Sequence, residues 1–154
     1  MTTRDSAGVI APPPLIYAVF LAVGIFARNL LKREVVPAPY NWSFGLALVV
    51  VGLLLVMAPA AALIQARTAL NPYGTTSKLL TNGIFRLSRN PIYLGITAAY
   101  LGIAIAFSLT IAVLLTPVIL AIMHYGVIRR EEAYLERKFG DDYLRYKAEV
   151  RRWL

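Results

Sequence analysis

Three long uncharged tracts constrain the fold of this chain more than any other feature. Of its 154 residues, none is charged from Ser6 to Ala27, from Val35 to Ala66 or from Asn90 to Ile128. A helix that crosses the hydrocarbon core of a bilayer needs about 20 apolar residues. Each of the first two tracts therefore fits one crossing, and the third is long enough for two short crossings joined by a tight turn.

The tracts predict an all-α fold, an integral membrane bundle of four transmembrane helices with a cytoplasmic C-terminal helical segment. The length suits a single domain, in which residues 1–66 supply the two N-terminal helices. A turn near Phe107–Thr110 would join the last two helices. The expected spans are Leu15–Leu31, Phe44–Ile64, Ile92–Phe107 and Ile111–Ile128.

Prolines mark the expected starts and bends of these helices. Proline is tolerated in the first turn of a helix, so Pro12–Pro14 and Pro91 should open the first and third helices. Pro117 lies inside the fourth and should bend it. Residues 1–11, ahead of the first prolines, are expected to be loose.

The basic residues are distributed unevenly about the predicted bundle. The net charge is +8. If the N-terminus lies inside, the only Lys and Arg residues on the outer side of the membrane are Arg28, Lys32 and Arg33. This asymmetry follows the positive-inside rule and places both termini in the cytoplasm, at a bacterial-type cytoplasmic (inner) membrane. The charge is thus explained by topology and by attraction to anionic membrane lipid, and no nucleic acid partner is expected.

Several chemistries are excluded or disfavoured by composition. The chain has no cysteine, so it can form neither a disulfide nor a thiolate nucleophile. Its single histidine, His124, has no second ligand nearby, and no metal site is expected. The absence of charge within the apolar tracts argues against an ion channel or a proton-coupled transporter.

Two polar segments lie at the ends of the third tract: Thr81–Gly95, which overlaps its start, and Arg129–Tyr146, which follows it. In the first, Asn90 and Pro91 stand at a predicted helix start, where free backbone N–H groups attract carboxylate or phosphate. The boundary of a membrane helix explains the same residues equally well, with asparagine as the helix cap and arginine at the membrane interface. Arg86 and Arg89 are expected to face water.

His124 and Glu131 are seven residues apart, so they share one face if the helix between them is continuous. They would then form the polar wall of a pocket. A histidine at the membrane interface, bound to water or backbone, explains His124 equally. Glu132 and Glu136 are expected to be solvated residues of a charged helix start.

Short motifs follow one another in a defined order across residues 75–152. They read Gly83-Ile84-Phe85, Arg89-Asn90-Pro91-Ile92-Tyr93-Leu94-Gly95, a helical hairpin, Glu131-Glu132 and Phe139-Gly140-Asp141-Asp142-Tyr143-Leu144-Arg145-Tyr146. This order resembles the integral-membrane methyltransferases, which include isoprenylcysteine carboxyl methyltransferase and the phospholipid N-methyltransferases.

The resemblance implies an S-adenosylmethionine-dependent methyltransferase whose cofactor lies in a cytoplasmic pocket, with residues 67–154 as the cofactor-binding half. It implies a lipophilic or small-molecule methyl acceptor that enters sideways from the membrane lipid. By position in the motifs, the cofactor-binding residues would be Ser77, Lys78, Leu79, Leu80, Phe85, Asn90, Pro91, Ile92, Tyr93 and Glu131.

Two positions depart from the family pattern. Asn90 stands where the eukaryotic motif has histidine, and Val127 stands where the isoprenylcysteine enzymes carry a substrate-binding arginine. Arg129 and Arg130 are the nearest substitutes, and they are the predicted substrate-binding residues. An amine or hydroxyl acceptor would need a base, for which Glu131 and His124 are the predicted catalytic residues.

Two alternatives stay open from the sequence. A membrane reductase of the sterol-reductase type would have a similar C-terminal half and would use NADPH, although such an enzyme is expected to be longer. A small non-enzymatic membrane scaffold would tolerate replacement of Asn90, Tyr93 and Glu131 without losing any small-molecule binding.

Overall fold

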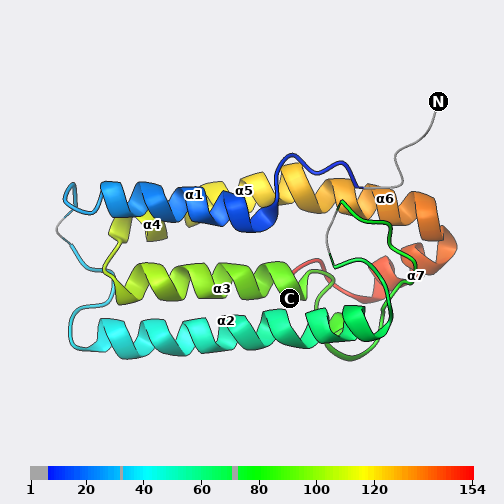
Figure 1. Ribbon diagram of the computed structural model, residues 1–154, viewed down its shortest axis with the longest axis horizontal. Coiled ribbons are helices and arrows are strands. Elements are labelled where there is room, and N and C mark those ends of the chain that lie inside the picture. Colours follow the sequence, from blue (N-terminus) through cyan, green and yellow to red (C-terminus); the bar gives the residue numbers. More distant parts are fainter. Residues whose placement is uncertain (1–6, 32, 71–72) are drawn as a thin grey trace.

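A computed structural model describes residues 7–31, 33–70 and 73–154, and each regular element in those ranges is helical. The bundle contains α1 (Pro13–Phe26), α2 (Tyr40–Gln65), α3 (Pro91–Ala106) and an interrupted path of α4 (Thr110–Leu114), α5 (Thr116–Ile122) and the π-helix η2 (Met123–Ile128). The 3₁₀-helix η1 (Gly83–Arg86) precedes α3, whereas α6 (Arg129–Phe139) and α7 (Asp141–Glu149) follow η2 at one end of the bundle (Figure 1).

The predicted helices are present, but the predicted count of four membrane spans is not confirmed. Within the described residues, only α2 is both long and apolar enough to cross a membrane by itself. Helix α1 has 14 residues and α3 has 16. At 1.5 Å per residue, α1 measures about 21 Å, less than the roughly 30 Å of a bilayer core.

The fourth helical path is broken rather than simply bent. Helix α4 ends at Leu114, and α5 begins at Thr116 with Pro117 in its first turn. Because proline lacks a backbone N–H, it interrupts the helical hydrogen bonds at this point, as its position predicted. The path then widens into a π-helix over Met123–Ile128, which the sequence did not predict.

Close packing of α2 on α3 rests on glycines at the contact. A Cβ atom on Gly52 would lie 2.6 Å from the backbone of both Gly95 and Ala99. A Cβ atom on Gly102 would lie 2.6 Å from the carbonyl oxygen of Gly45. Small residues of this kind allow helix backbones to approach within a distance that larger side chains prevent.

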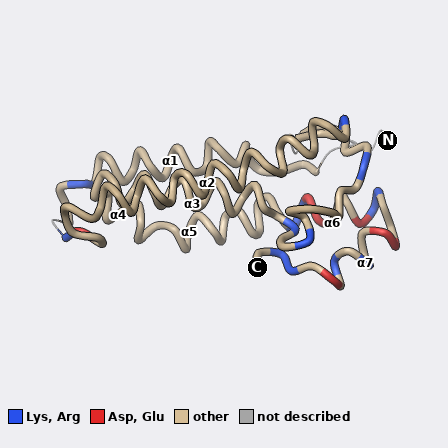
Figure 2. Tube along the Cα trace, turned by 90° about the horizontal axis from the view of Figure 1, so that it is seen from below, with Lys and Arg blue, Asp and Glu red and all other residues tan. Residues whose placement is uncertain are grey.

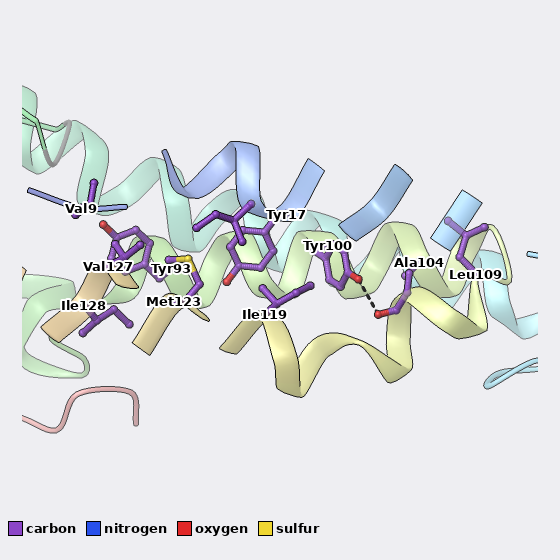
Figure 3. Packing of buried hydrophobic residues seen from close by; sticks show 12 residues of the cluster. Val9, Tyr17, Tyr93, Tyr100, Ala104, Leu109, Ile119, Met123, Val127 and Ile128 are labelled. Carbon is purple, nitrogen blue, oxygen red and sulfur yellow. Dashed lines mark hydrogen bonds between the residues drawn. The ribbon is translucent and has the colours of Figure 1, made fainter. Parts of the chain in front are cut away.

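Helix α1 packs on α3 and α4 through a core that Figure 3 shows from close by. The Tyr17 hydroxyl lies 2.7 Å from Thr97 Oγ1, and the Tyr17 ring meets the Tyr100 ring edge-on at 5.7 Å between centroids. The Tyr100 hydroxyl donates to the carbonyl oxygen of Ala112 at 2.7 Å. These bonds satisfy tyrosine hydroxyls inside an apolar bundle.

Charged residues gather at the two ends of the bundle, and the helices between them are almost free of charge (Figure 2). The outer surface of α2 is apolar, and Leu54 and Met57 are 62% and 64% exposed. Exposed apolar surface of this extent marks contact with lipid or with another protein.

The segment ahead of α1 is ordered by contacts with the η2–α6 region, so the expectation of a loose N-terminus is wrong for residues 7–11. Val9 is buried, and Ile10 N–H donates to the carbonyl oxygen of Gly126 at 3.2 Å. The Arg130 guanidinium donates to the carbonyl oxygen of Gly8 at 2.8 Å. The predictions for residues 1–6, as part of a loose N-terminus, and for Lys32, on the outer side of the membrane, concern residues outside the described part of the chain.

Candidate functional site

A cavity of about 640 Å³ opens where the α2–α3 loop, the start of α3, α6 and α7 meet. Its apolar side is formed by Val56, Ala60 and Leu63 of α2 and by Ile96 of α3. Its other side carries the charged and aromatic residues of the chain's polar end. These are Lys78, Arg89, Tyr93, Glu131, Glu132, Tyr134, Tyr143 and Tyr146.

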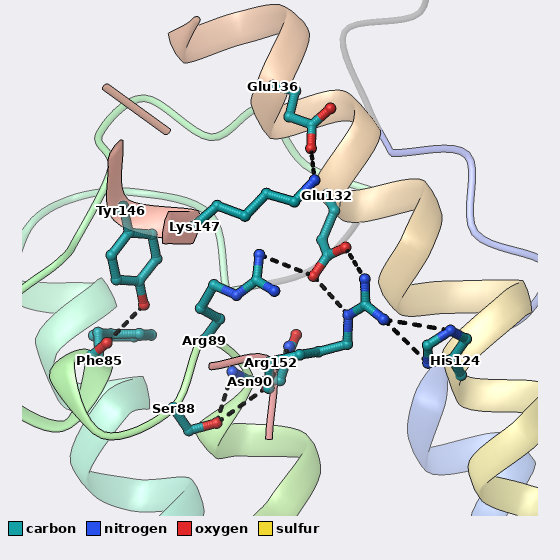
Figure 4. Close-up of polar contacts among 10 residues, drawn as sticks. All are labelled: Phe85, Ser88, Arg89, Asn90, His124, Glu132, Glu136, Tyr146, Lys147 and Arg152. Atoms are coloured by element: carbon teal, nitrogen blue, oxygen red, sulfur yellow. Dashed lines mark hydrogen bonds and ion pairs between the residues drawn. The ribbon is translucent and has the colours of Figure 1, made fainter. Parts of the chain in front are cut away.

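The turn before α3 is held by hydrogen bonds to the C-terminal segment (Figure 4). Asn90 precedes the helix but its side chain makes no capping bond, contrary to the sequence interpretation. Instead, Asn90 Nδ2 donates to the carbonyl oxygen of Arg152 at 2.9 Å, and Asn90 N–H donates to Ser88 Oγ at 3.1 Å. With Pro91 in the first turn, the α3 start therefore keeps free backbone N–H groups beside the cavity.

Tyr93 and Glu131 connect the start of α3 to the start of α6 at the cavity wall. The Tyr93 hydroxyl donates to Glu131 Oε1 at 2.7 Å. Burial raises the pKa of Glu131 to about 7, with the Tyr93 hydrogen bond opposing this rise and the negative charge of Glu132 adding to it. A carboxyl group with such a pKa can take up or release a proton near neutral pH.

Glu132 is buried, so the prediction that it is solvated is wrong. Arg152 donates to both carboxylate oxygens of Glu132, from Nε to Oε1 at 2.9 Å and from Nη2 to Oε2 at 2.6 Å (Figure 4). Arg89 Nη1 lies 3.2 Å from Oε1. Burial alone would raise the pKa of Glu132, but the Arg152 hydrogen bonds and the two guanidinium charges lower it. Glu132 therefore stays ionised as the centre of a buried ion-pair cluster.

Arg89 also differs from the prediction that it faces water. Its side chain is 8% exposed, and its backbone N–H donates to the carbonyl oxygen of Arg151 at 3.0 Å. Among the described residues, its buried Nε and Nη1 atoms form no hydrogen bond, although Nη1 is in ion-pair contact with Glu132 Oε1 at 3.2 Å, and Arg89 lines the cavity. A buried guanidinium whose Nε forms no hydrogen bond can donate to a ligand that carries a carboxylate.

The structure brings most of the predicted cofactor-binding residues to one cavity. It is lined by Lys78, Leu79, Leu80, Phe85, Asn90, Pro91, Ile92, Tyr93 and Glu131. Ser77 is outside this lining. The Ser77 Oγ donates to the carbonyl oxygen of Arg67 at 2.9 Å, and its backbone N–H donates to Thr68 Oγ1 at 2.9 Å.

His124 does not share a wall with Glu131. It lines a separate, smaller cavity with Leu94, Thr97, Leu120 and Trp153, and both of its ring nitrogens face Arg152 Nη1 at 3.4–3.5 Å. In a continuous α-helix, residues seven apart lie on the same face, which is why the spacing predicted a shared wall. The π-helix between the two residues changes that register.

The two predicted substrate-binding arginines also lie outside the main cavity. Arg129 stacks over the Tyr125 ring at 5.8 Å. Arg130 is bound to the backbone of Gly8 and so holds the segment ahead of α1. That segment does reach the cavity, because Ala7 and Pro12–Pro14 form part of its lining.

Sequence reasoning missed the roles of Arg89, Glu132, Arg152 and the aromatic side chains of α6 and α7. Tyr146 donates to the carbonyl oxygen of Phe85 at 2.7 Å, and the Tyr134 hydroxyl accepts from Thr76 N–H at 3.1 Å. The signal was present as an aromatic stripe between charges in Arg129–Tyr146. Such a stripe indicates that α6 and α7 pack against something, here the α2–α3 loop.

Fold and site together define a small helical protein with a mixed polar and apolar cavity at the charged end of an apolar bundle. A family model described as phospholipid methyltransferase matches residues 40–142. The chain therefore belongs to the phospholipid methyltransferase family, which confirms the resemblance seen in the sequence. The match favours a methyltransferase and does not favour the reductase alternative.

One similar protein, from Haemophilus influenzae, is described only as uncharacterized. It is 41% identical over 63 residues, which cover 41% of this chain and 79% of the relative. No solved structure matches the chain. The comparisons thus give the family but not the methyl acceptor.

Proposed function

We propose that this protein is an S-adenosylmethionine-dependent methyltransferase that acts at the large cavity on a lipophilic or small acceptor. The observation that carries the proposal is that Asn90–Tyr93 and Glu131 line one cavity in a member of this family. When bound there, S-adenosylmethionine supplies an activated methyl group, so the protein mainly has to orient the reactants and exclude water.

The residues at the polar end of the cavity fit a cofactor with a carboxylate, an ammonium and a sulfonium group. Arg89 offers its buried Nε, which has no hydrogen-bond partner among the described residues, for the carboxylate. Glu131 supplies an acceptor, and the ring of Tyr93 can stabilise a nearby cation. The lining also supplies apolar side chains, such as Leu79 and Phe85, for a flat heterocycle.

Glu131 is the group we assign to proton transfer if the acceptor is an amine or a hydroxyl. Its pKa of about 7 allows the carboxylate to accept a proton at neutral pH. His124 lies in the other cavity, so the geometry supports Glu131 and not His124 for this role. Arg129 and Arg130 likewise keep no direct place beside the acceptor in this proposal.

We assign the acceptor's entry to the apolar end of the cavity, between α2 and α3. Val56, Ala60 and Leu63 face it from α2, and Ile96 faces it from α3. These helices belong to the charge-free part of the bundle, which we propose is embedded in the cytoplasmic membrane as a multi-pass protein with both termini in the cytoplasm. An acceptor with an acyl or prenyl chain would then reach the cavity from the lipid.

The test is methyl transfer from radiolabelled S-adenosylmethionine by the purified protein in lipid vesicles, with the labelled product extracted and identified. We expect label in the lipid or small-molecule fraction. For an amine or hydroxyl acceptor, Glu131→Gln should reduce the rate of methyl transfer at least tenfold. The matched control is Glu136→Gln, which changes a glutamate on the same helix outside the cavity lining. Binding of NADPH without binding of S-adenosylmethionine or its demethylated product would overturn the proposal.

A further inference from the structure

The C-terminal segment after α7 returns to the polar end of the cavity, outside the residues that the family model matches. Within it, Arg152 makes two different kinds of contact (Figure 4). Its backbone carbonyl oxygen accepts from Asn90 Nδ2 at 2.9 Å and from Ser88 Oγ at 3.3 Å. Its guanidinium binds both oxygens of Glu132 on α6. One residue thus joins the turn before α3 to α6.

The guanidinium contact determines what is left for Arg89. Arg152 makes the two well-formed hydrogen bonds to Glu132, at 2.9 and 2.6 Å. Arg89 approaches the same carboxylate at 3.2 Å without forming a hydrogen bond through Nη1. A carboxylate can accept a bidentate pair from a single arginine, and here Arg152 holds that position.

We propose that Arg152 is a positioning residue for the cofactor: because it makes both hydrogen bonds to Glu132, Arg89 keeps only an ion-pair contact with that carboxylate, and the Arg89 guanidinium can also bind a carboxylate in the cavity. This inference rests on the proposed function. Without Arg152, Arg89 would be the remaining guanidinium in contact with the buried Glu132 carboxylate, and its N–H groups would form the hydrogen bonds that Arg152 now makes. The cavity would then lose the Arg89 guanidinium as a hydrogen-bond donor although Arg89 is still present.

The experiment measures the affinity of S-adenosylhomocysteine by titration calorimetry, with the protein in detergent or lipid nanodiscs. For Arg152→Ala we expect about a tenfold or greater loss, the size of one hydrogen bond to a charged group. Arg151→Ala is the matched control, because the Arg151 side chain is exposed and its contact with Arg89 uses the backbone. Its affinity should stay within about twofold of wild type.

Two double variants separate this role from a merely structural one. In Arg152→Ala/Glu132→Gln, the neutral side chain no longer competes for Arg89, and we expect most of the lost affinity to return. In a protein that already carries Arg89→Ala, adding Arg152→Ala should reduce the affinity for S-adenosylhomocysteine little further, because both substitutions act through the Arg89 guanidinium. If Arg152→Ala does not fold, Arg152→Lys replaces it in the experiment. Lysine retains the charge but not the bidentate geometry of the guanidinium, so the loss of affinity should be intermediate.

Unchanged affinity in both Arg152→Ala and Arg152→Lys, or no recovery with Glu132→Gln, would overturn this inference while wild-type binding leaves the proposed function in place. A wild-type protein that binds neither S-adenosylmethionine nor S-adenosylhomocysteine would overturn the proposed function, and this inference with it.

Discussion

The Tyr93 hydroxyl donates a 2.7 Å hydrogen bond to Glu131 Oε1 and so joins the first turn of α3 to the first turn of α6. The two residues are far apart in sequence and both line the large cavity. Around this bond the polar groups of the site divide into two sets. Glu131 faces the cavity with a raised pKa, whereas Glu132 is held ionised by Arg89 and Arg152.

Removal of the Tyr93 hydroxyl should shift the pH dependence of activity. The Tyr93 hydrogen bond lowers the pKa of Glu131, so Tyr93→Phe should raise that pKa above its value of about 7. If ionised Glu131 is the active form, the rise of kcat/KM with pH should move to higher pH in the variant. A pH–rate profile measures this, and an unchanged midpoint would show that Glu131 does not control the rate.

Glu131 should also make the folded protein less stable as pH rises. Burial raises its pKa from 4.5 to about 7, so the folded state binds more protons than the unfolded state between these values. Stability from this group is full below about pH 4.5 and is lost as pH rises toward 7, by on the order of 3 kcal/mol. The melting temperature of wild type should fall relative to that of Glu131→Gln as pH rises over this range. The same dependence of melting temperature on pH in both proteins would contradict the burial of this carboxyl.

Loss of Glu132 should destabilise the protein strongly. Glu132→Ala leaves Arg89 and Arg152 without their shared carboxylate in a buried site, which typically costs about 3–5 kcal/mol. The control is Asp142→Ala, which breaks the ion pair with Arg145, whose two side chains are 73% and 70% exposed. That change should cost less than about 1 kcal/mol. Similar melting temperatures for the two variants would show that the Glu132 cluster is not buried as described.

The glycine contact between α2 and α3 should not accept a large side chain. A Cβ atom at Gly52 already falls 2.6 Å from the backbone of α3, so Gly52→Leu should separate the helices and cost about 1–3 kcal/mol or more. Ala47→Leu adds the same side chain at an exposed position of α2 and should be close to neutral. Thermal unfolding in detergent compares the two, and a tolerant Gly52 would contradict the packing.

The sequence predicted the parts of this structure that depend on local pattern. Uncharged tracts and prolines located the helices, and the ordered motifs identified the family and led to Asn90–Tyr93 and Glu131, which meet at one cavity. It failed where the outcome depends on distant residues. Glu132 and Arg89 look solvated until Arg152 returns from the C-terminal segment to cover them.

Helix register was the second source of error. The face of His124 relative to Glu131 depends on one turn of π-helix, and no local residue pattern in Met123–Ile128 indicated it. The predicted number of spans is not confirmed, for a related reason. Charge-free length set an upper limit for each helix, whereas α1 ends at Phe26, before the expected Leu31, and α3 matches its expected span but has only 16 residues.

We propose above that the start of α3 and Glu131 hold the same ligand. The most direct test of this proposal is calorimetric titration of S-adenosylhomocysteine into wild type, Tyr93→Ala, Glu131→Ala and the control Glu136→Ala. We expect one saturable site in wild type and Glu136→Ala, with affinity reduced about tenfold or more in both Tyr93→Ala and Glu131→Ala. No binding to wild type, or wild-type affinity in both cavity variants, would contradict the claim.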